Sequence, residues 1–152
     1  MGTQLKTKAF GEMTVNDEQL VDFRDGILGF DSIKKFAILE EEGSPFLWLQ
    51  AVEEHSLAFV MISPLSFLDE YSLVISQSDL DDVGAKDPQE LLVYSIVTIP
   101  SDKPADMTAN LQGPIIINPA TRKGKQAISL SDKYFVRHRI IDEMKKRAEK
   151  EV

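Results

Sequence analysis

Short apolar runs separated by turn-forming residues are the feature that most constrains what this chain can fold into. Such runs suit β-strands and are too short for most helices. Their repeated spacing predicts an antiparallel sheet that folds into a barrel or a sandwich. The predicted strands span residues 36–42, 46–52, 56–63, 71–76, 91–99, 113–118 and 126–130.

Two of these runs, residues 56–63 and 91–99, are apolar at both odd and even positions. Both faces of each strand are therefore expected to be covered, as in the centre of a closed sheet. Pro119 predicts the end of a strand, and Gly124 predicts a hairpin turn with a positive φ angle. The predicted fold class is mostly β: a small, antiparallel, barrel-like single domain with a few short helices.

The predicted helices are few and short. Residues 31–36 are expected to form one turn with Asp31 as N-cap. Residues 78–84 are expected to form another, with Ser78 as N-cap and Gly84 past its end.

The C-terminal residues differ in composition from the rest of the chain. The 152 residues divide into a predicted domain, residues 1–141, and a charged tail, residues 142–152. The tail is rich in helix formers, and Glu143 lies four residues before Arg147. We expect a terminal helix that is frayed or ordered by a partner.

The charges are distributed unevenly along the chain, which has a net charge of −8. Residues 40–106 hold 14 acidic side chains against Lys86 and Lys103, a net charge of −12. This balance disfavours direct binding to nucleic acid, which depends on clustered Lys and Arg. It predicts an acidic face that attracts a basic protein. The alternative, that acidic loops serve only to keep the protein soluble, remains open.

The residues that carry most enzyme chemistry are sparse. The chain has no cysteine, and its two histidines, His55 and His138, lie 83 positions apart. No phosphate-binding loop, metal-ligand spacing or serine-nucleophile motif is present. We therefore expect no enzymatic activity, no cofactor and no metal. No apolar run approaches the ~20 residues of a membrane span, so a soluble intracellular protein is expected.

Several polar and apolar stretches fit molecular recognition better than catalysis. FRDGILGF, residues 23–30, is interpreted as a tight core loop, with surface display as the alternative. Residues 65–71 place Phe67 beside Asp69 and Glu70, which predicts an apolar wedge with an acidic rim. Residues 107–112 alternate polar and apolar side chains, which predicts a strand with one polar face. That face is expected at or beside a partner site, with a purely structural role in pairing loop backbone as the open alternative.

Six ordered motifs give the chain a family resemblance over residues 10–140. They are FRDGILGF, PFLWLQ, LAFVMISPLSF, DEYSLVI, IVTIP and MTANLQGPIIIN, followed by GKQAI and YFVRHRI. In order and spacing they closely resemble the flagellar assembly factor FliW family. The charged tail after Ile141 is longer than the family pattern requires.

The resemblance implies a non-enzymatic cytoplasmic protein, monomeric when unbound, that binds two partners in exchange. One implied partner is flagellin, the filament subunit. The other is CsrA, a small dimeric RNA-binding protein that represses flagellin translation. After flagellin is secreted, the freed factor would bind CsrA and relieve that repression, with each ligand lowering the affinity for the other.

The predicted partner-binding residues come from the acidic and the alternating stretches. They are Phe67, Asp69, Glu70, Tyr71, Asp79, Asp81, Asp82, Met107, Thr108, Asn110 and Gln112. One alternative is a small-molecule or metal-binding barrel whose mouth carries His55 or the amides. Another is RNA binding by the basic tail, which is weaker because Tyr134 and Phe135 are the only aromatic residues beside it.

Overall fold

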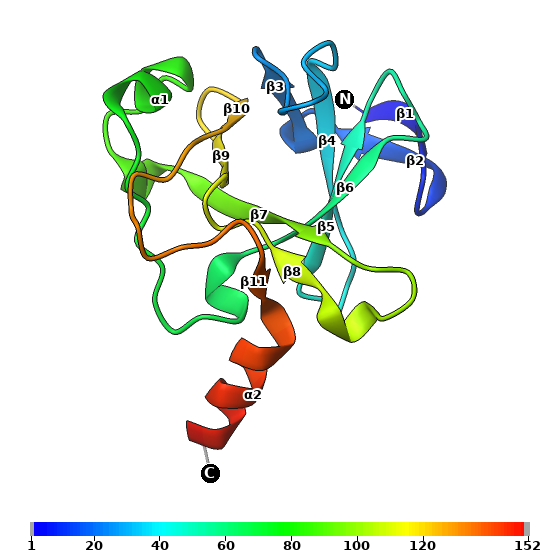
Figure 1. The fold of residues 1–152 in the computed structure, drawn as a ribbon. Helices are drawn as coiled ribbons and strands as arrows, with labels where there is room; N and C mark the ends of the chain where they lie inside the picture. Colours follow the sequence, from blue (N-terminus) through cyan, green and yellow to red (C-terminus); the bar gives the residue numbers. More distant parts are fainter. Residues whose placement is uncertain (1, 151–152) are drawn as a thin grey trace.

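The main sheet closes on itself in the computed structural model, which describes residues 2–150 (Figure 1). Its strands pair in the order β7-β6-β5-β4-β3-β10-β9, and a pairing between β9 and β7 completes the ring. Closure leaves no free edge around the ring. The strands are β3 (Leu20–Phe23), β4 (Lys35–Glu40), β5 (Phe46–Ala51), β6 (Ala58–Ile62), β7 (Leu92–Thr98), β9 (Ile115–Asn118) and β10 (Lys123–Gln126).

Neighbouring strands of the ring run antiparallel except for β3 and β10, which are parallel. The predicted mostly β, barrel-like single domain is confirmed. β6 and β7, the two runs expected at the centre of the sheet, are neighbours in the ring. Large apolar side chains fill its interior: Phe23, Phe36, Leu49, Met61, Ile115 and Ile117 are each fully buried.

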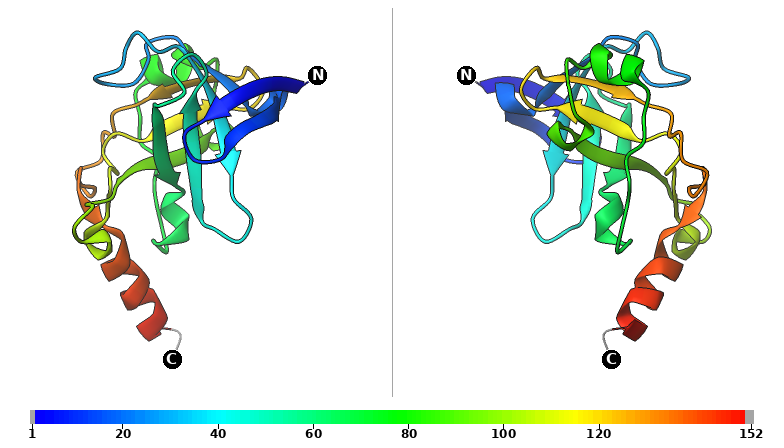
Figure 2. Two further views of the ribbon diagram at one scale, coloured as in Figure 1. Left: turned by 90° about the vertical axis from the view of Figure 1, so that its right-hand side faces the viewer. Right: turned by 90° about the vertical axis from the view of Figure 1, so that its left-hand side faces the viewer.

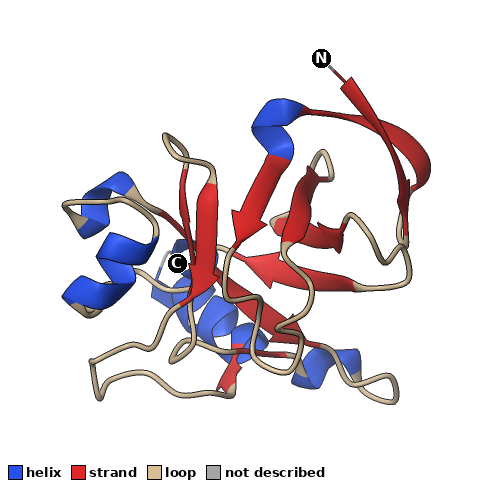
Figure 3. Cartoon of the chain, turned by 90° about the horizontal axis from the view of Figure 1, so that it is seen from above, coloured by secondary structure: helices blue, strands red, loops and turns tan. Residues whose placement is uncertain are grey.

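Further strands extend this ring. The hairpin of β1 (Gly2–Thr7) and β2 (Gly11–Asn16) packs Leu5 and Val15 against Ala37 and Leu39 of β4. β8 (Thr108–Ala109) pairs with the end of β7, and β11 (His138–Arg139) pairs with β8. Seen from above, the hairpin lies to one side of the barrel (Figure 3).

Two α-helices and several short 3₁₀ turns complete the fold. α1 (Gln77–Asp82) lies beside the barrel, whereas α2 (Ile140–Lys150) projects from its lower end (Figures 1 and 2). α2 covers residues 142–150 of the predicted tail, while residues 151–152 of that prediction lie outside the described residues. The first residue of α2, Ile140, is fully buried. The 3₁₀ turns are η1 (Asp17–Gln19), η2 (Pro64–Ser66), η3 (Pro88–Glu90) and η4 (Pro104–Asp106).

Two predicted strands are absent. Residues 71–76 form no strand, and only one backbone bond, from Leu130 N to Val74 O at 2.8 Å, joins this segment to residues 126–130. The second predicted strand, 126–130, is also wrong, because β10 ends at Gln126. Since the pairing of β7 with β9 already closes the ring, neither segment is needed as a strand.

The predicted helix turns are partly wrong. No helix is capped by Asp31: residues 31–34 form a turn and a short loop, and residues 35–36 already belong to β4. The N-cap of α1 is Ser76, whose Oγ accepts a hydrogen bond from Asp79 N at 3.1 Å, in place of the predicted Ser78. Gly84 follows α1 at φ +70°, as predicted.

The turn between β9 and β10 follows Pro119, as predicted, but its positive φ angle belongs to Arg122 at 58°. Gly124 lies inside β10 instead. A Cβ there would approach two ring atoms of Phe23 at 2.8 and 2.9 Å. The glycine is therefore needed for close packing against β3 rather than for a turn.

Candidate protein-recognition surfaces

The predicted binding residues lie in three places: the junction between the barrel and α2, the helix α1, and a pocket beside β10. The junction includes Phe67, Tyr71 and Met107, which pack around Leu111 and Ile140. Segments from the middle and the end of the chain meet here. The structure corrects one residue of this set: Phe67 is 1% exposed, so it supports the surface from beneath and forms no exposed wedge.

Tyr71 is held in the junction by its hydroxyl and its ring. The hydroxyl donates a hydrogen bond to Leu111 O at 3.1 Å, and the ring centroid lies 4.5 Å from that of Tyr134. Burial, and then the proximity of Tyr134, raises the pKa of Tyr71 to about 12. The Tyr134 hydroxyl accepts a hydrogen bond from Ser72 N at 2.8 Å. These contacts make Tyr71 a structural element of the junction.

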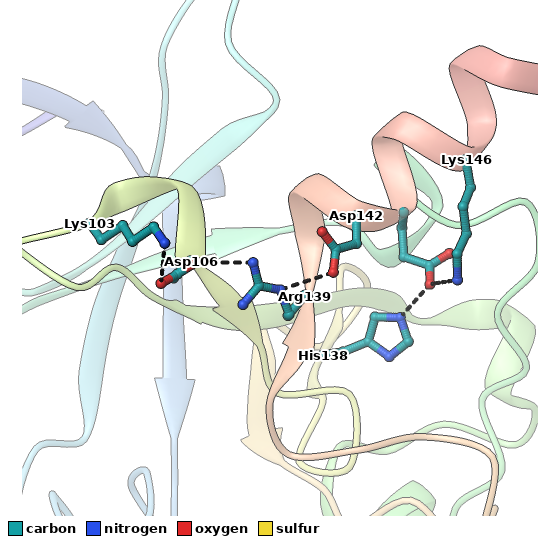
Figure 4. Close-up of polar contacts among 7 residues, drawn as sticks. Lys103, Asp106, His138, Arg139, Asp142 and Lys146 are labelled. Atoms are coloured by element: carbon teal, nitrogen blue, oxygen red, sulfur yellow. Dashed lines mark hydrogen bonds and ion pairs between the residues drawn. The ribbon is translucent and has the colours of Figure 1, made fainter.

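Arg139 is the centre of an ion-pair network at the start of α2 (Figure 4). Its guanidinium donates to Asp106 Oδ1 and to Asp142 Oδ2, each at 2.9 Å. The Asp106 hydrogen bond and the nearby Asp142 charge raise the pKa of Arg139. Lys103 lies 3.8 Å from Asp106. Thr108, a predicted site residue, pairs with Arg139 through the strand backbone.

His138, the residue before Arg139, belongs to a second group of polar contacts. Its Nε2 lies 3.1 Å from Glu143 Oε1 (Figure 4). Glu143 in turn lies 3.5 Å from Lys146. One turn further along α2, Arg147 donates to Leu65 O at 3.1 Å and lies 3.5 Å from Asp69. Most charged groups of this junction therefore have partners within the chain.

Two acidic residues of α1 form ion pairs within the chain, and the third faces solvent. Asp79 and Asp82 contact Lys125 Nζ at 2.8 and 2.7 Å. Burial lowers the pKa of Lys125, but the hydrogen bonds to the two carboxylates outweigh it and raise that pKa above its usual value. Asp81 is exposed, and its carboxylate accepts a hydrogen bond from Gln77. Of the three predicted acids, Asp81 is thus the one that faces solvent.

A pocket of about 520 Å³ lies where three segments distant in sequence meet. It is lined by residues 25–28 and Asp31 after β3, by Asn110, Gln112 and Gly113 before β9, and by residues 125–128 and Val136. The predicted amides Asn110 and Gln112 therefore line the same pocket as Lys125. The α1 carboxylates Asp79 and Asp82 compensate the charge of Lys125.

Two amide side chains hold the walls of this pocket together. Gln126 accepts a hydrogen bond from Leu28 N at 3.3 Å and donates one to Gly113 O at 3.2 Å. Asn110 Oδ1 accepts from Gln112 N and Gly113 N at 3.1 and 2.9 Å. Asn110 therefore shapes the pocket by closing a turn, whereas the Gln112 side chain is exposed.

Exposed aliphatic side chains line the same pocket. Leu28 is 89% exposed, Ile128 73% and Val136 54%; we call these three residues the apolar rim. Leu130 and Phe135, in the same segment as Ile128 and Val136, are also exposed. Sequence reasoning missed the rim because it interpreted residues 126–130 as a strand and residues 23–30 as a core loop. Ile27 is buried as expected, but Leu28 is not.

Of the residues expected of the small-molecule or metal-binding alternative, the amides Asn110 and Gln112 line the pocket beside β10, whereas His55 does not. His55 lies in the exposed turn between β5 and β6. Within residues 2–150, no group of three His, Cys, Asp or Glu side chains could hold a metal ion. In the same range, neither helix is long and apolar enough to cross a membrane.

The fold and these surfaces define a small seven-stranded β-barrel with two α-helices. A crystal structure of the flagellar assembly factor FliW matches it with a TM-score of 0.82 and 35% sequence identity. The match covers 91% of this chain and 96% of that one. The likeness extends over nearly the whole fold.

Sequence comparison gives the same result. The family model described as FliW protein matches residues 4–140. The flagellar assembly factor FliW of Leptospira interrogans is 46% identical over 143 residues, covering 93% of this chain and 95% of that protein. That of Leptospira biflexa is 41% identical, with full coverage of both chains. The chain belongs to the FliW family of flagellar assembly factors, as its motifs predicted.

Proposed function

We propose that this protein is a non-enzymatic cytoplasmic regulator that binds flagellin and CsrA in exchange. Bound flagellin occupies the protein while subunits accumulate. Once flagellin is secreted, the free protein binds CsrA and relieves repression of the flagellin message. Membership of a family of flagellar assembly factors over nearly the whole chain is the observation that carries this proposal.

The charge distribution supports a basic partner. Residues 40–106 carry a net charge of −12, and an RNA-binding protein such as CsrA presents a basic surface to its own ligand. The acidic side chains that are open to a partner include Glu70 and Asp81, both exposed. Charges of this kind mainly speed encounter and make binding sensitive to salt.

Isothermal titration with CsrA and with flagellin from the same organism tests the proposal. Each partner is titrated at low and at high salt, and CsrA is titrated again after saturation with flagellin. We expect binding to both partners, weaker CsrA binding at high salt, and suppression of CsrA binding by flagellin. Binding to neither partner would overturn the proposal.

A double variant, Glu70→Gln with Asp81→Asn, tests the charge argument separately. CsrA affinity is expected to fall most at low salt, with a smaller salt dependence than in the parent chain. Glu12→Gln with Glu18→Gln is the matched control, because it removes two exposed acids from the N-terminal segment. Equal effects of both double variants would contradict a localised acidic site.

A further inference from the structure

The pocket beside β10 has features that the family assignment does not explain. We propose that the pocket and its apolar rim form the docking site for a peptide segment of CsrA that carries apolar and basic side chains. This inference rests on the proposed function, because it assigns one of the two proposed partners to a surface.

The first argument is exposed apolar area. Leu28 and the pair Ile128 and Val136 come from two segments about 100 positions apart in sequence, yet all three residues line one pocket. Clusters of exposed aliphatic side chains are rare on soluble monomers and mark interaction sites. Such residues supply the anchors of a protein interface when a partner excludes water from them.

The second argument is that the rim has a fixed backbone. Leu28 N donates to the Gln126 side chain, and Ile27 forms a β-bridge with Phe30. On the other side, Ser129 N donates to Gln112 O at 2.8 Å and Ala127 N donates to Pro114 O at the same distance. The backbone that carries the exposed side chains is therefore fixed before a partner arrives, which lowers the entropic cost of binding.

The third argument is charge. Asp25 and Asp31 line the pocket. Within residues 2–150, neither carboxylate forms an ion pair. Lys125 also lines it, but Asp79 and Asp82 already compensate its charge twice over. The pocket lining thus presents two carboxylates, Asp25 and Asp31, and a segment with Lys or Arg complements them.

These features select among possible occupants. The acidic lining repels phosphates, so it disfavours RNA and nucleotides as ligands. Of the two proposed partners, CsrA is the one whose basic character as an RNA-binding protein matches the carboxylates. Apolar residues of its segment would cover the rim, and a basic residue would approach Asp25 or Asp31.

The test measures CsrA binding by titration with a rim variant, Leu28→Ser with Ile128→Ser. Both side chains are largely exposed, so the variant is expected to fold, which its circular dichroism and unfolding midpoint will show. We expect at least a tenfold loss of CsrA affinity. Ile99→Ser is the matched control, because Ile99 is 44% exposed, does not line the pocket and belongs to no predicted binding stretch. It is expected to bind CsrA normally.

A charge variant, Asp25→Asn with Asp31→Asn, provides the second readout. It is expected to weaken CsrA binding and to reduce its salt dependence, whereas the rim variant leaves the salt dependence unchanged. If the parent chain binds CsrA and both variants bind it equally well, the docking site is wrong while the proposed function stands. If the parent chain itself does not bind CsrA, both the proposed function and the docking site are wrong.

The rim could also join two copies of this chain, and sedimentation separates that outcome. Our proposal expects a monomer for the parent chain and for the rim variant at titration concentrations. A parent dimer that the rim variant dissociates would overturn the proposal, because the rim would then be a self-association face.

Discussion

The α2 junction and the pocket beside β10 differ in whether their charged groups are paired and their apolar groups buried. At the junction, Arg139 binds Asp106 and Asp142 (Figure 4). The apolar residue Ile140 beside it is fully buried. At the pocket, Leu28 is 89% exposed. This difference indicates that a charged cluster whose members bind one another stabilises the fold. Groups left open on a fixed backbone are better candidates for recognition.

Removing the buried anchor of the junction should have the largest effect. Ile140→Ala deletes a fully buried side chain from the cluster that includes Phe67 and Leu111. Urea unfolding should show a loss of about 3 kcal/mol in the free energy of unfolding. Ile141→Ala, at the half-buried neighbour, is the control and should cost clearly less. Equal losses would mean that α2 is not anchored through Ile140.

Lys125→Met tests the ion cluster behind the pocket. It leaves Asp79 and Asp82 close together without their shared cation, so a loss of about 2 kcal/mol is expected. Lys123→Met, at an exposed position of the same strand, should change little. A neutral result for Lys125→Met would mean that water replaces the ammonium group at no cost.

The same substitution has a pH signature. The pKa of Lys125 is raised in the folded protein, so its stabilisation is fully present below the ordinary value of 10.5. That stabilisation is lost as the pH rises through the folded pKa above 10.5. Unfolding curves above that pH should therefore bring the parent chain closer to Lys125→Met in stability. A constant difference across this range would contradict the raised pKa.

Tyr71→Phe sharpens the contrast at the junction with a smaller effect. It removes the hydrogen bond to Leu111 O, which should cost about 1 kcal/mol at pH 7. The folded pKa is about 12 and the ordinary value is 10.0, so the parent chain loses stability as the pH rises through this interval. Unfolding curves of the variant should fall less steeply there.

Some alkaline loss should remain in Tyr71→Phe. Burial, and then the Glu40 charge, also raises the pKa of Tyr94. Tyr94 therefore also lowers the free energy of unfolding as the pH rises above 10.0. An unchanged slope in Tyr71→Phe would show that Tyr71 does not stay protonated in the folded protein.

Leu28→Ser should have the smallest effect on stability, within about 0.5 kcal/mol, because its side chain already faces solvent. Ile27→Ser at the adjacent, buried position is the contrasting variant and should be strongly destabilising. The two unfolding midpoints should therefore differ widely. Similar midpoints would remove the distinction between the rim and the core on which the docking proposal depends.

Sequence pattern was most informative for strands with continuous apolar runs. Residues 46–52 and 91–99 are strands β5 and β7 to within a residue, because short continuous apolar runs suit strands. The predicted burial of both faces of 91–99 is only partial, since Leu92 is 41% exposed. The hairpin of β1 and β2 was missed, because its exposed strands carry few apolar residues. Residues 71–76 carry a strand-like pattern without forming a strand, since the closed ring offers no edge to pair with.

The candidate sites were predictable to a lesser degree. The predicted strand over 107–112 is wrong except at Thr108–Ala109, where β8 pairs with β7. Ala109 and Leu111 are buried and Gln112 is exposed as predicted, but Met107, Thr108 and Asn110 are all half-buried. Ile128 was misjudged, because alternation shows which residues share a face but not which face is buried. In residues 127–130, the small residues Ala127 and Ser129 point inward and the large apolar residues point outward.

The sequence by itself determined the mostly β class, the absence of thiol chemistry, the acidic middle of the chain and the family. Local composition and ordered motifs carry that information directly. The tertiary structure alone decided which charges are compensated and which apolar groups stay open. Closure of the ring brings Leu28 and Gln126 into hydrogen-bond contact across 98 positions of sequence. Contacts of that range depend on strand pairing, which local pattern does not encode.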